Sequence, residues 1–196
     1  YRKEQNEIKI LETNLLHELK QNYYSRLSLR GVLNSVIDVS DSITANWNSI
    51  SSIKVKIFHS NSLYDKNERI ELILSNSYGL TSRNMYLNSL INSGLILKIK
   101  SSAIRNQIES VNLLVSGNYL QSNEVIENNI KDWFVKYSKK EESLNNELIF
   151  DKHKDFELYQ FLTLRRRNEV YKLSGVNGNI KFLEEIINEI KANGLF

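Results

Sequence analysis

Apolar residues recur at helical spacing over most of the first fifty positions. From residue 8 to 19 they lie three or four residues apart, and from residue 29 the alternation resumes with one polar member. Such spacing places side chains on one face of an α-helix, so a long first helix is predicted. Between these stretches, residues 21–33 shift the stripe and include Gly31, which predicts a bend or a register change. The stripe consists of Ile8, Leu11, Leu15, Leu19, Leu29, Leu33, Val36, Ser40, Ile43, Trp47 and Ile50.

Residues 52–66 have a different pattern. Ile53, Val55 and Ile57 alternate with lysines, which is the period of a β-strand. A lone strand has no obvious partner elsewhere in the chain. An irregular connector or the end of a helix is therefore favoured over a strand.

Two short helices are predicted next. Asp65 or Asn67 is expected to cap the first, which Gly79 would end. Thr81 or Ser82 is expected to cap the second. The apolar face of this second helix is formed by Tyr86, Leu87, Leu90 and Ile91.

Gly94 follows the second short helix and interrupts an apolar stretch. We predict that it ends the helix in the left-handed conformation, where a side chain would clash. Residues 95–100 then continue as an extended segment or a turn that buries Leu95, Leu97 or Ile99. Ser101 or Ser102 is expected to cap the following helix.

Two more long helices are predicted in the second half of the chain. The first could run from residue 102 to about residue 149, with a local bend at Gly117. The second starts near Asp155, after a polar break at 151–155. Residues 174–179 contain two glycines, which predict either a weak spot or a helix-turn-helix. The two apolar stripes are Ile104, Ile108, Val111, Val115, Ile126, Ile130, Trp133, Tyr137, Leu144 and Leu148, and then Phe156, Tyr159, Leu162, Leu173, Val176, Ile180, Leu183, Ile187 and Ile190.

These segments together predict an all-α protein. The expected architecture is an elongated helical bundle, with long first, middle and last helices and short connecting helices, and residues 1–196 form a single domain. The chain contains no proline, which breaks helix interiors, so long helices are permitted throughout.

The charge balance argues against a nucleic-acid partner. The net charge is only +3, and the one compact basic run is Arg165, Arg166 and Arg167. Three consecutive helical residues point in three directions, so this run does not form one patch and is interpreted as a solvated helix surface. Cysteine is absent, which excludes disulfides and thiol catalysis.

No catalytic, metal-binding or cofactor-binding motif is found in the sequence. The three histidines are far apart, and the acidic loop around His153 lacks the glycine and the distal glutamate of a calcium loop. No glycine-rich phosphate loop or nucleophile elbow occurs. We therefore predict no catalytic residue, no metal and no cofactor.

One aromatic and basic cluster is a candidate binding site. Tyr23, Tyr24, Arg26 and Arg30 could hold a small anion between helices, since Arg26 and Arg30 lie four residues apart on a helix. The alternative is that the tyrosines belong to the core and the arginines extend along it to reach solvent.

Residues 84–108 carry a pattern of aromatic, leucine, small residue, glycine, apolar pair and Ile-Arg. This pattern resembles an uncharacterised family of single-pass membrane proteins common in Bacteroidota. The resemblance implies a transmembrane helix before residue 1 and an α-helical domain outside the cytoplasm, in the periplasm. It implies no active site. The matching positions are Tyr86, Leu90, Ser93, Gly94, Leu95, Ile99, Ile104 and Arg105.

Three functions remain open at this point. The first is a non-enzymatic structural or protein-interaction domain of a membrane-anchored envelope protein, with a protein partner or self-association. The second is a ligand-sensing extracytoplasmic bundle, which a pocket lined by convergent Tyr and Arg side chains would favour and a fully packed core would oppose. The third is an enzyme. For location, a cytoplasmic partner-binding protein is the alternative to the periplasm.

Overall fold

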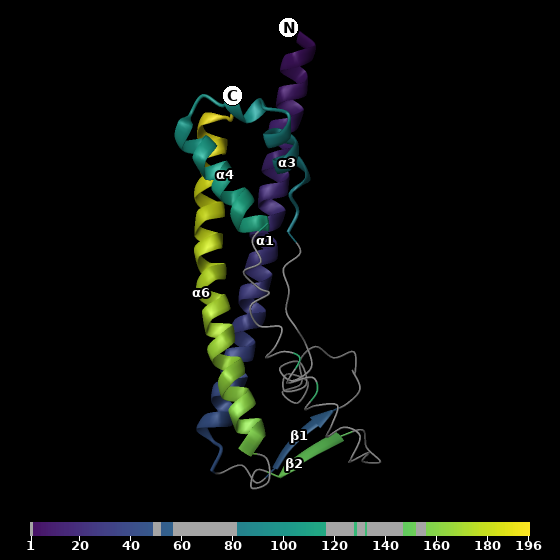
Figure 1. The fold of residues 1–196 in the computed structure, drawn as a ribbon, viewed down its shortest axis with the longest axis vertical. Helices are drawn as coiled ribbons and strands as arrows, with labels where there is room; N and C mark the ends of the chain where they lie inside the picture. Colours follow the sequence, from purple (N-terminus) through teal and green to yellow (C-terminus); the bar gives the residue numbers. More distant parts are fainter. Residues whose placement is uncertain are drawn as a thin grey trace. The chain divides into compact units, whose positions relative to one another are not determined.

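A computed structural model describes residues 2–48, 52–56, 82–116, 128, 132, 147–151 and 156–196. The described part is mainly helical, so the all-α fold with long first and last helices is confirmed (Figure 1). A single pair of short strands is the exception within these ranges. The elements are α1 (Arg2–Ala45), β1 (Ser52–Lys56), α3 (Met85–Asn92), the 3-10 helix η1 (Leu95–Lys98), α4 (Ser102–Ser116), β2 (Glu147–Asp151) and α6 (Phe156–Asn193).

The chain divides into two compact units. Unit 1 comprises residues 1–30, 80–119 and 174–196, and unit 2 comprises residues 31–79 and 120–173. Both long helices, α1 and α6, contribute residues to each unit. The expected single domain stays a prediction.

Unit 1 has one continuous apolar core. Buried leucines, isoleucines and a valine of α1, α3, η1, α4 and the last turns of α6 meet there. Each fully buried side chain of this kind stabilises the fold by about 1.5–3 kcal/mol relative to an exposed one. The core residues are Leu15, Leu19, Leu87, Leu90, Ile96, Ile99, Ile104, Ile108, Val111, Leu183, Ile186, Ile187, Ile190 and Leu195.

The buried stripe of α1 runs without a register change, so the predicted shift at 21–33 is wrong. Between Leu19 and Leu29 the buried positions are Asn22 and Arg26, which keep the same alternation of three and four residues. Polar residues occupy this part of the stripe, and an apolar pattern alone cannot detect them. The helix itself is uninterrupted through Gly31.

Gly94 has the predicted left-handed backbone, with φ of 72° and ψ of 3°. It directly follows the C-cap of α3, and its N–H donates to the Ile91 carbonyl. The chain then forms η1, which buries Ile96 and leaves Leu97 74% exposed. Of the residues expected to be buried in this segment, Leu97 was therefore predicted wrongly. Ile99 is buried as expected, and Ser101 caps α4 through a 3.2 Å hydrogen bond from the Ile104 N–H.

Two glycine substitutions should shift stability in opposite directions. Gly94→Ala should lower the free energy of unfolding by about 1 kcal/mol, because a Cβ at positive φ is strained. Gly178→Ala should raise it by about 0.5–1 kcal/mol, because Gly178 lies in the interior of α6, where an added Cβ would meet no neighbouring atom within 4 Å. Urea unfolding curves of the two variants measure both effects. A raised unfolding midpoint for Gly94→Ala would contradict the helix boundary.

Residues 52–56 form a β-strand. The favoured prediction of an irregular connector or a helix end is therefore wrong for these residues. β1 pairs antiparallel with β2, with Ile53 opposite Phe150 and Val55 opposite Leu148. The partner strand lies where the sequence predicts the end of the long middle helix. That prediction is wrong at 147–149, and the helix that begins at Ser102 is described only as far as Ser116.

α6 begins at Phe156, close to the predicted start at Asp155, and continues to Asn193. The segment 174–179 is helical throughout, so no helix-turn-helix forms there. Several predictions fall outside the described residues: those on Ile50, Ile57, His59, Asp65, Asn67, Gly79, Thr81, Gly117, Ile126, Ile130, Trp133, Tyr137, Leu144, His153 and Asp155.

Candidate functional site

Glu18 of α1 closes the N-terminus of α3. Its Oε2 accepts a hydrogen bond from the Tyr86 N–H at 3.0 Å, and its Oε1 accepts one from the Leu87 N–H at 3.0 Å. Asn84, at the N-cap position itself, makes no side-chain capping bond. A carboxylate at this place satisfies free N–H donors and complements the helix dipole. Capping by Ser82 is therefore wrong: the cap comes from another helix.

Asn22, one turn further along α1, holds the chain just before α3. Its Nδ2 donates to the Arg83 carbonyl at 2.6 Å, and its Oδ1 accepts from the Arg83 N–H at 2.9 Å. Gln21 adds a third contact, since its Oε1 accepts from Arg83 Nη1 at 2.9 Å. Both main-chain groups of Arg83 are thus satisfied by one amide side chain.

Arg26 lies one further turn along and is buried, with only 2% of its surface exposed. Its Nη1 donates to the Asn22 carbonyl at 3.0 Å and its Nη2 to Ser82 Oγ at 3.2 Å. Burial lowers the pKa of the Arg26 guanidinium, because desolvation penalises the charged form. Glu18, Asn22 and Arg26 form what we call the polar ladder, which fixes residues 82–87 against α1.

The predicted cluster of Tyr23, Tyr24, Arg26 and Arg30 is only partly brought together. The two tyrosine rings meet edge to face, with centroids 5.5 Å apart and planes at 72°. Tyr23 packs against the core, whereas Tyr24 is largely exposed. Arg26 is buried in the polar ladder and Arg30 is exposed, so the two guanidiniums do not share one accessible face.

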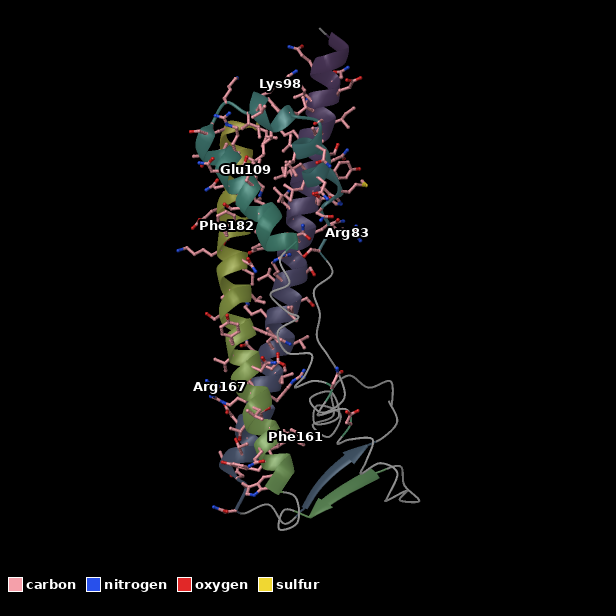
Figure 2. The ribbon with its side chains drawn as sticks, in the orientation of Figure 1. Arg83, Lys98, Glu109, Phe161, Arg167 and Phe182 are labelled. Atoms are coloured by element: carbon pink, nitrogen blue, oxygen red, sulfur yellow. The ribbon has the colours of Figure 1, made fainter. Side chains whose placement is uncertain are left out.

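An open hollow of about 350 Å³ lies beside the polar ladder. Four α1 residues and one residue of the segment before α3 line it, and its size is within the range of small-molecule sites. Arg83 is exposed and supplies the cation of this lining (Figure 2). The lining residues are Gln21, Asn22, Tyr24, Ser25 and Arg83.

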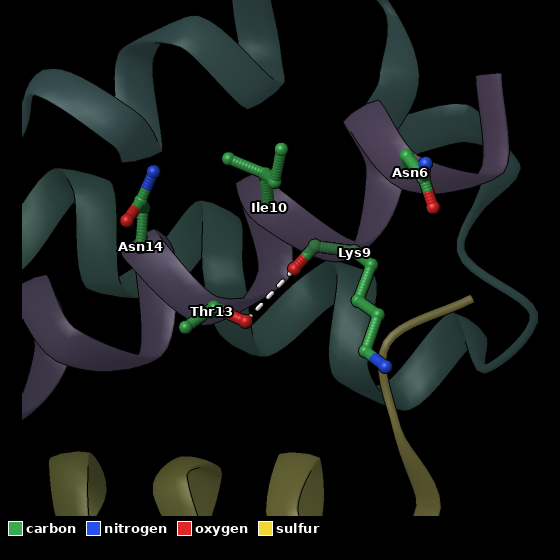
Figure 3. A pocket seen from close by; sticks show the side chains of 5 residues that line it. All are labelled: Asn6, Lys9, Ile10, Thr13 and Asn14. Carbon is green, nitrogen blue, oxygen red and sulfur yellow. Dashed lines mark hydrogen bonds between the residues drawn. The ribbon is translucent and has the colours of Figure 1, made fainter. Parts of the chain in front are cut away.

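A second hollow, of about 450 Å³, follows the N-terminal turns of α1 (Figure 3). Its described lining comes from one helix face, with Lys9 as the single charged member. Thr13 Oγ1 donates to the Lys9 carbonyl at 2.9 Å, so that hydroxyl already serves the helix backbone. The lining residues are Asn6, Lys9, Ile10, Thr13 and Asn14.

Unit 2 contains buried charges on α6. Glu169 lies 2.9 Å from Arg165 Nε and 3.7 Å from Lys172 Nζ, and all three side chains are buried. Arg166 makes a two-pronged hydrogen bond to Asp41, which raises the pKa of Arg166 through that bond and through the carboxylate charge. The interpretation of the three arginines as a solvated surface is therefore wrong for Arg165. Arg167 is exposed (Figure 2).

Metal-ligating side chains do not gather in the part of the chain that the structure describes. No group of three His, Asp or Glu residues there is placed to hold an ion. His17 is exposed and its Nε2 lies 2.8 Å from Gln21 Nε2.

The sequence reasoning missed Glu18, Asn22 and Arg83. One signal for Asn22 and Arg26 was present in the sequence. The two residues continue the spacing of three and four between Leu19 and Leu29, and that spacing marks the buried face of a helix. Nothing in the sequence marks Arg83, whose role depends on where residues 82–84 meet α1.

Comparison with known proteins adds no relative. No protein-family model matches the chain, and no curated protein or solved structure matches it either. The family suggested by residues 84–108 therefore stays a prediction. Among the described helices, none combines the length and the apolar character that crossing a bilayer requires.

Proposed function

We propose that the protein is a non-enzymatic structural or protein-interaction domain of a membrane-anchored envelope protein. The polar ladder carries this proposal. Glu18, Asn22 and Arg26 are the buried polar residues among those that the structure describes in unit 1, and each binds main-chain or hydroxyl groups of residues 82–87. Their hydrogen bonds serve to hold one helix on another, as expected of a scaffold.

Exposed apolar side chains supply a contact surface for a partner. Tyr24 is 64% exposed and Met85 is 65% exposed. Tyr24 lines the hollow together with Arg83, and Met85 follows Arg83 by two residues. Tyrosine, methionine and arginine are enriched at protein interfaces. We define Tyr24, Arg83 and Met85 as the contact surface.

Photo-crosslinking from position 85 tests the interaction. A crosslinker placed at Met85 in the full-length protein should give one defined adduct, either with a second copy or with another protein. Tyr24→Ser should reduce that adduct, because it removes apolar area from the contact surface. A crosslinker at the exposed Leu97, outside the contact surface, is the control. Equal and diffuse labelling from both positions would argue against an interaction role.

Membrane anchoring rests on the resemblance of residues 84–108 to the membrane-protein family. A basic segment followed by about 20 apolar residues, encoded directly before Tyr1, is the expected anchor. Membrane fractionation of the full-length protein, with protease added outside the inner membrane, tests both the anchor and the periplasmic location. Recovery of a protease-protected protein in the soluble fraction would favour the cytoplasmic alternative.

A ligand-sensing bundle is the second candidate, and the hollow lined by Tyr24 and Arg83 favours it. The packed core of unit 1 argues for a scaffold instead. The two roles are compatible, since a ligand could act on the same contact surface.

Binding to duplex DNA should be weak and quickly lost with salt. The net charge is +3, and two residues of the basic run are paired with carboxylates, Arg165 with Glu169 and Arg166 with Asp41. Of this run, the exposed Arg167 is left to release counterions from phosphates. Fluorescence anisotropy with a labelled duplex measures this. Sub-micromolar binding that persists at about 0.2 M salt would overturn the prediction.

A further inference from the structure

The hollow near the start of α1 has the arrangement of a coiled-coil hole. Four of its lining residues follow the spacing i, i+3, i+4 and i+7: Asn6, Lys9, Ile10 and Thr13 (Figure 3). Four residues with this spacing surround the hole into which one side chain of a packed helix inserts. Ile10 is 60% exposed, so most of its apolar surface is in contact with water.

The hollow beside the polar ladder repeats this spacing. Gln21, Tyr24 and Ser25 lie at i, i+3 and i+4, and Tyr24 is 64% exposed. Tyr24 follows Ile10 by fourteen residues, which is about 21 Å along the helix axis. Two heptads rotate the side-chain direction by only about 40°, so the two hollows lie on one face of α1. Their separation matches side chains two heptads apart on another helix.

Both hollows carry positive charge. Lys9 lines the first and Arg83 lines the second, both are exposed, and neither described lining includes a carboxylate. The side-chain hydrogen bond described for the Arg83 guanidinium goes to the neutral Oε1 of Gln21. Glu18 of α1 is buried, and its two oxygens are bound to the start of α3. The carboxylate of Glu18 therefore does not neutralise this face.

This charge decides which kind of helix fits the two hollows. A second copy of the chain would place like charges opposite each other whether the two α1 helices ran parallel or antiparallel, since both ends of the face carry a cation. Like charges brought together across an interface are unfavourable, whereas an acidic surface is complementary. The occupant indicated by the charge is therefore a different, acidic helix.

We propose that the two hollows together bind an acidic amphipathic helix of a partner protein. Its apolar side chains pack against Ile10 and Tyr24, and its carboxylates lie beside Lys9 and Arg83. Helix-in-groove recognition uses apolar anchors at such helical spacing. The inference rests on the proposed interaction role and names the kind of partner. It extends the contact surface along α1 to Ile10.

Two matched synthetic peptides of three heptads test the proposal. Both have leucine at the first and alanine at the fourth position of each heptad, and their charged positions are all glutamate in one peptide and all lysine in the other. Fluorescence anisotropy of the labelled peptides, titrated with the full chain, measures binding. We expect saturable binding of the acidic peptide, at least about tenfold tighter than that of the basic peptide. Similar affinities for the two peptides, or saturable binding of neither, would overturn the proposal.

Matched variants locate the binding on α1. Ile10→Ser and Tyr24→Ser should each weaken binding of the acidic peptide about tenfold, because each removes an apolar anchor, while the circular dichroism spectrum stays helical. Lys9→Gln should also weaken it. Lys181→Gln removes the same charge from a position of α6 that is 80% exposed and should leave binding unchanged. Equal losses in Lys9→Gln and Lys181→Gln would show attraction by net charge alone and refute the site.

Other occupants of the hollows give different results. A dimer of the chain alone in sedimentation velocity that is lost in Ile10→Ser would assign the hollows to a second copy. Binding to anionic vesicles that is lost in the same variant would assign them to a lipid surface. Either result would overturn the acidic helix. A defined crosslink from Met85 that persists in Ile10→Ser would keep the interaction role while refuting this site, so the two failures are distinguishable.

Discussion

Replacing Leu90 by alanine should lower the free energy of unfolding by about 2–5 kcal/mol. Leu90 is fully buried in α3 and belongs to the unit 1 core that α1, α4 and α6 share. Truncation removes apolar contacts and leaves a cavity that the surrounding helices can only partly fill. Alanine keeps a high helix propensity, so the loss reports packing and not helix formation. Urea unfolding followed by far-UV circular dichroism measures the change.

Leu97→Ala is the matched control for this prediction. Leu97 belongs to η1, a few residues further along, but it is 74% exposed. Its truncation should change the unfolding free energy by no more than about 0.5 kcal/mol. Similar losses for both leucines would mean that the core of unit 1 is not organised around α3.

The regular apolar stripes allowed the helices to be predicted. α1 and α6 repeat buried positions at spacings of three and four over many turns, and local spacing is sufficient to recognise that pattern. Gly94 was predictable for a similar reason. A glycine between two helices that have their own caps indicates a left-handed residue that ends the first helix. Residues 95–99 were not, because whether Ile96 or Leu97 is buried depends on the 3-10 turn that follows Gly94.

Features that depend on distant partners were not predictable. β1 has the strand alternation, but its partner β2 lies more than ninety residues later and has no such alternation of polar residues. The cap of α3 comes from Glu18, which is 68 residues away from Tyr86. Local sequence favours a Ser or Thr cap, and only the packing of α3 on α1 reveals that a carboxylate takes this place.

The candidate site was also predictable only where local sequence determines it. Arg26 was recognised as a candidate because it follows Tyr23 and Tyr24 and lies four residues before Arg30, on the same face of a helix. Its burial was not anticipated, since the stripe was expected to shift at this point. Asn22 and Arg26 in fact continue the stripe, which places their polar side chains where Arg83 and Ser82 accept hydrogen bonds from them. The polar residues in the core are thus explained by the backbone groups they satisfy.

Glu18→Ala should lower the free energy of unfolding by about 2–3 kcal/mol. The substitution removes two charge-assisted hydrogen bonds and leaves the N–H groups of Tyr86 and Leu87 without an acceptor. Leu87 is buried, so water does not easily replace the carboxylate, whereas Tyr86 is only half-buried and loses less. Amide hydrogen exchange should accelerate at these two positions more than elsewhere in α3. Glu184→Ala, at an exposed position of α6, should change stability by no more than about 0.5 kcal/mol. If Glu18→Ala unfolds like Glu184→Ala and the exchange rates in α3 stay unchanged, Glu18 does not cap α3, and the polar ladder is not what fixes α3 to α1.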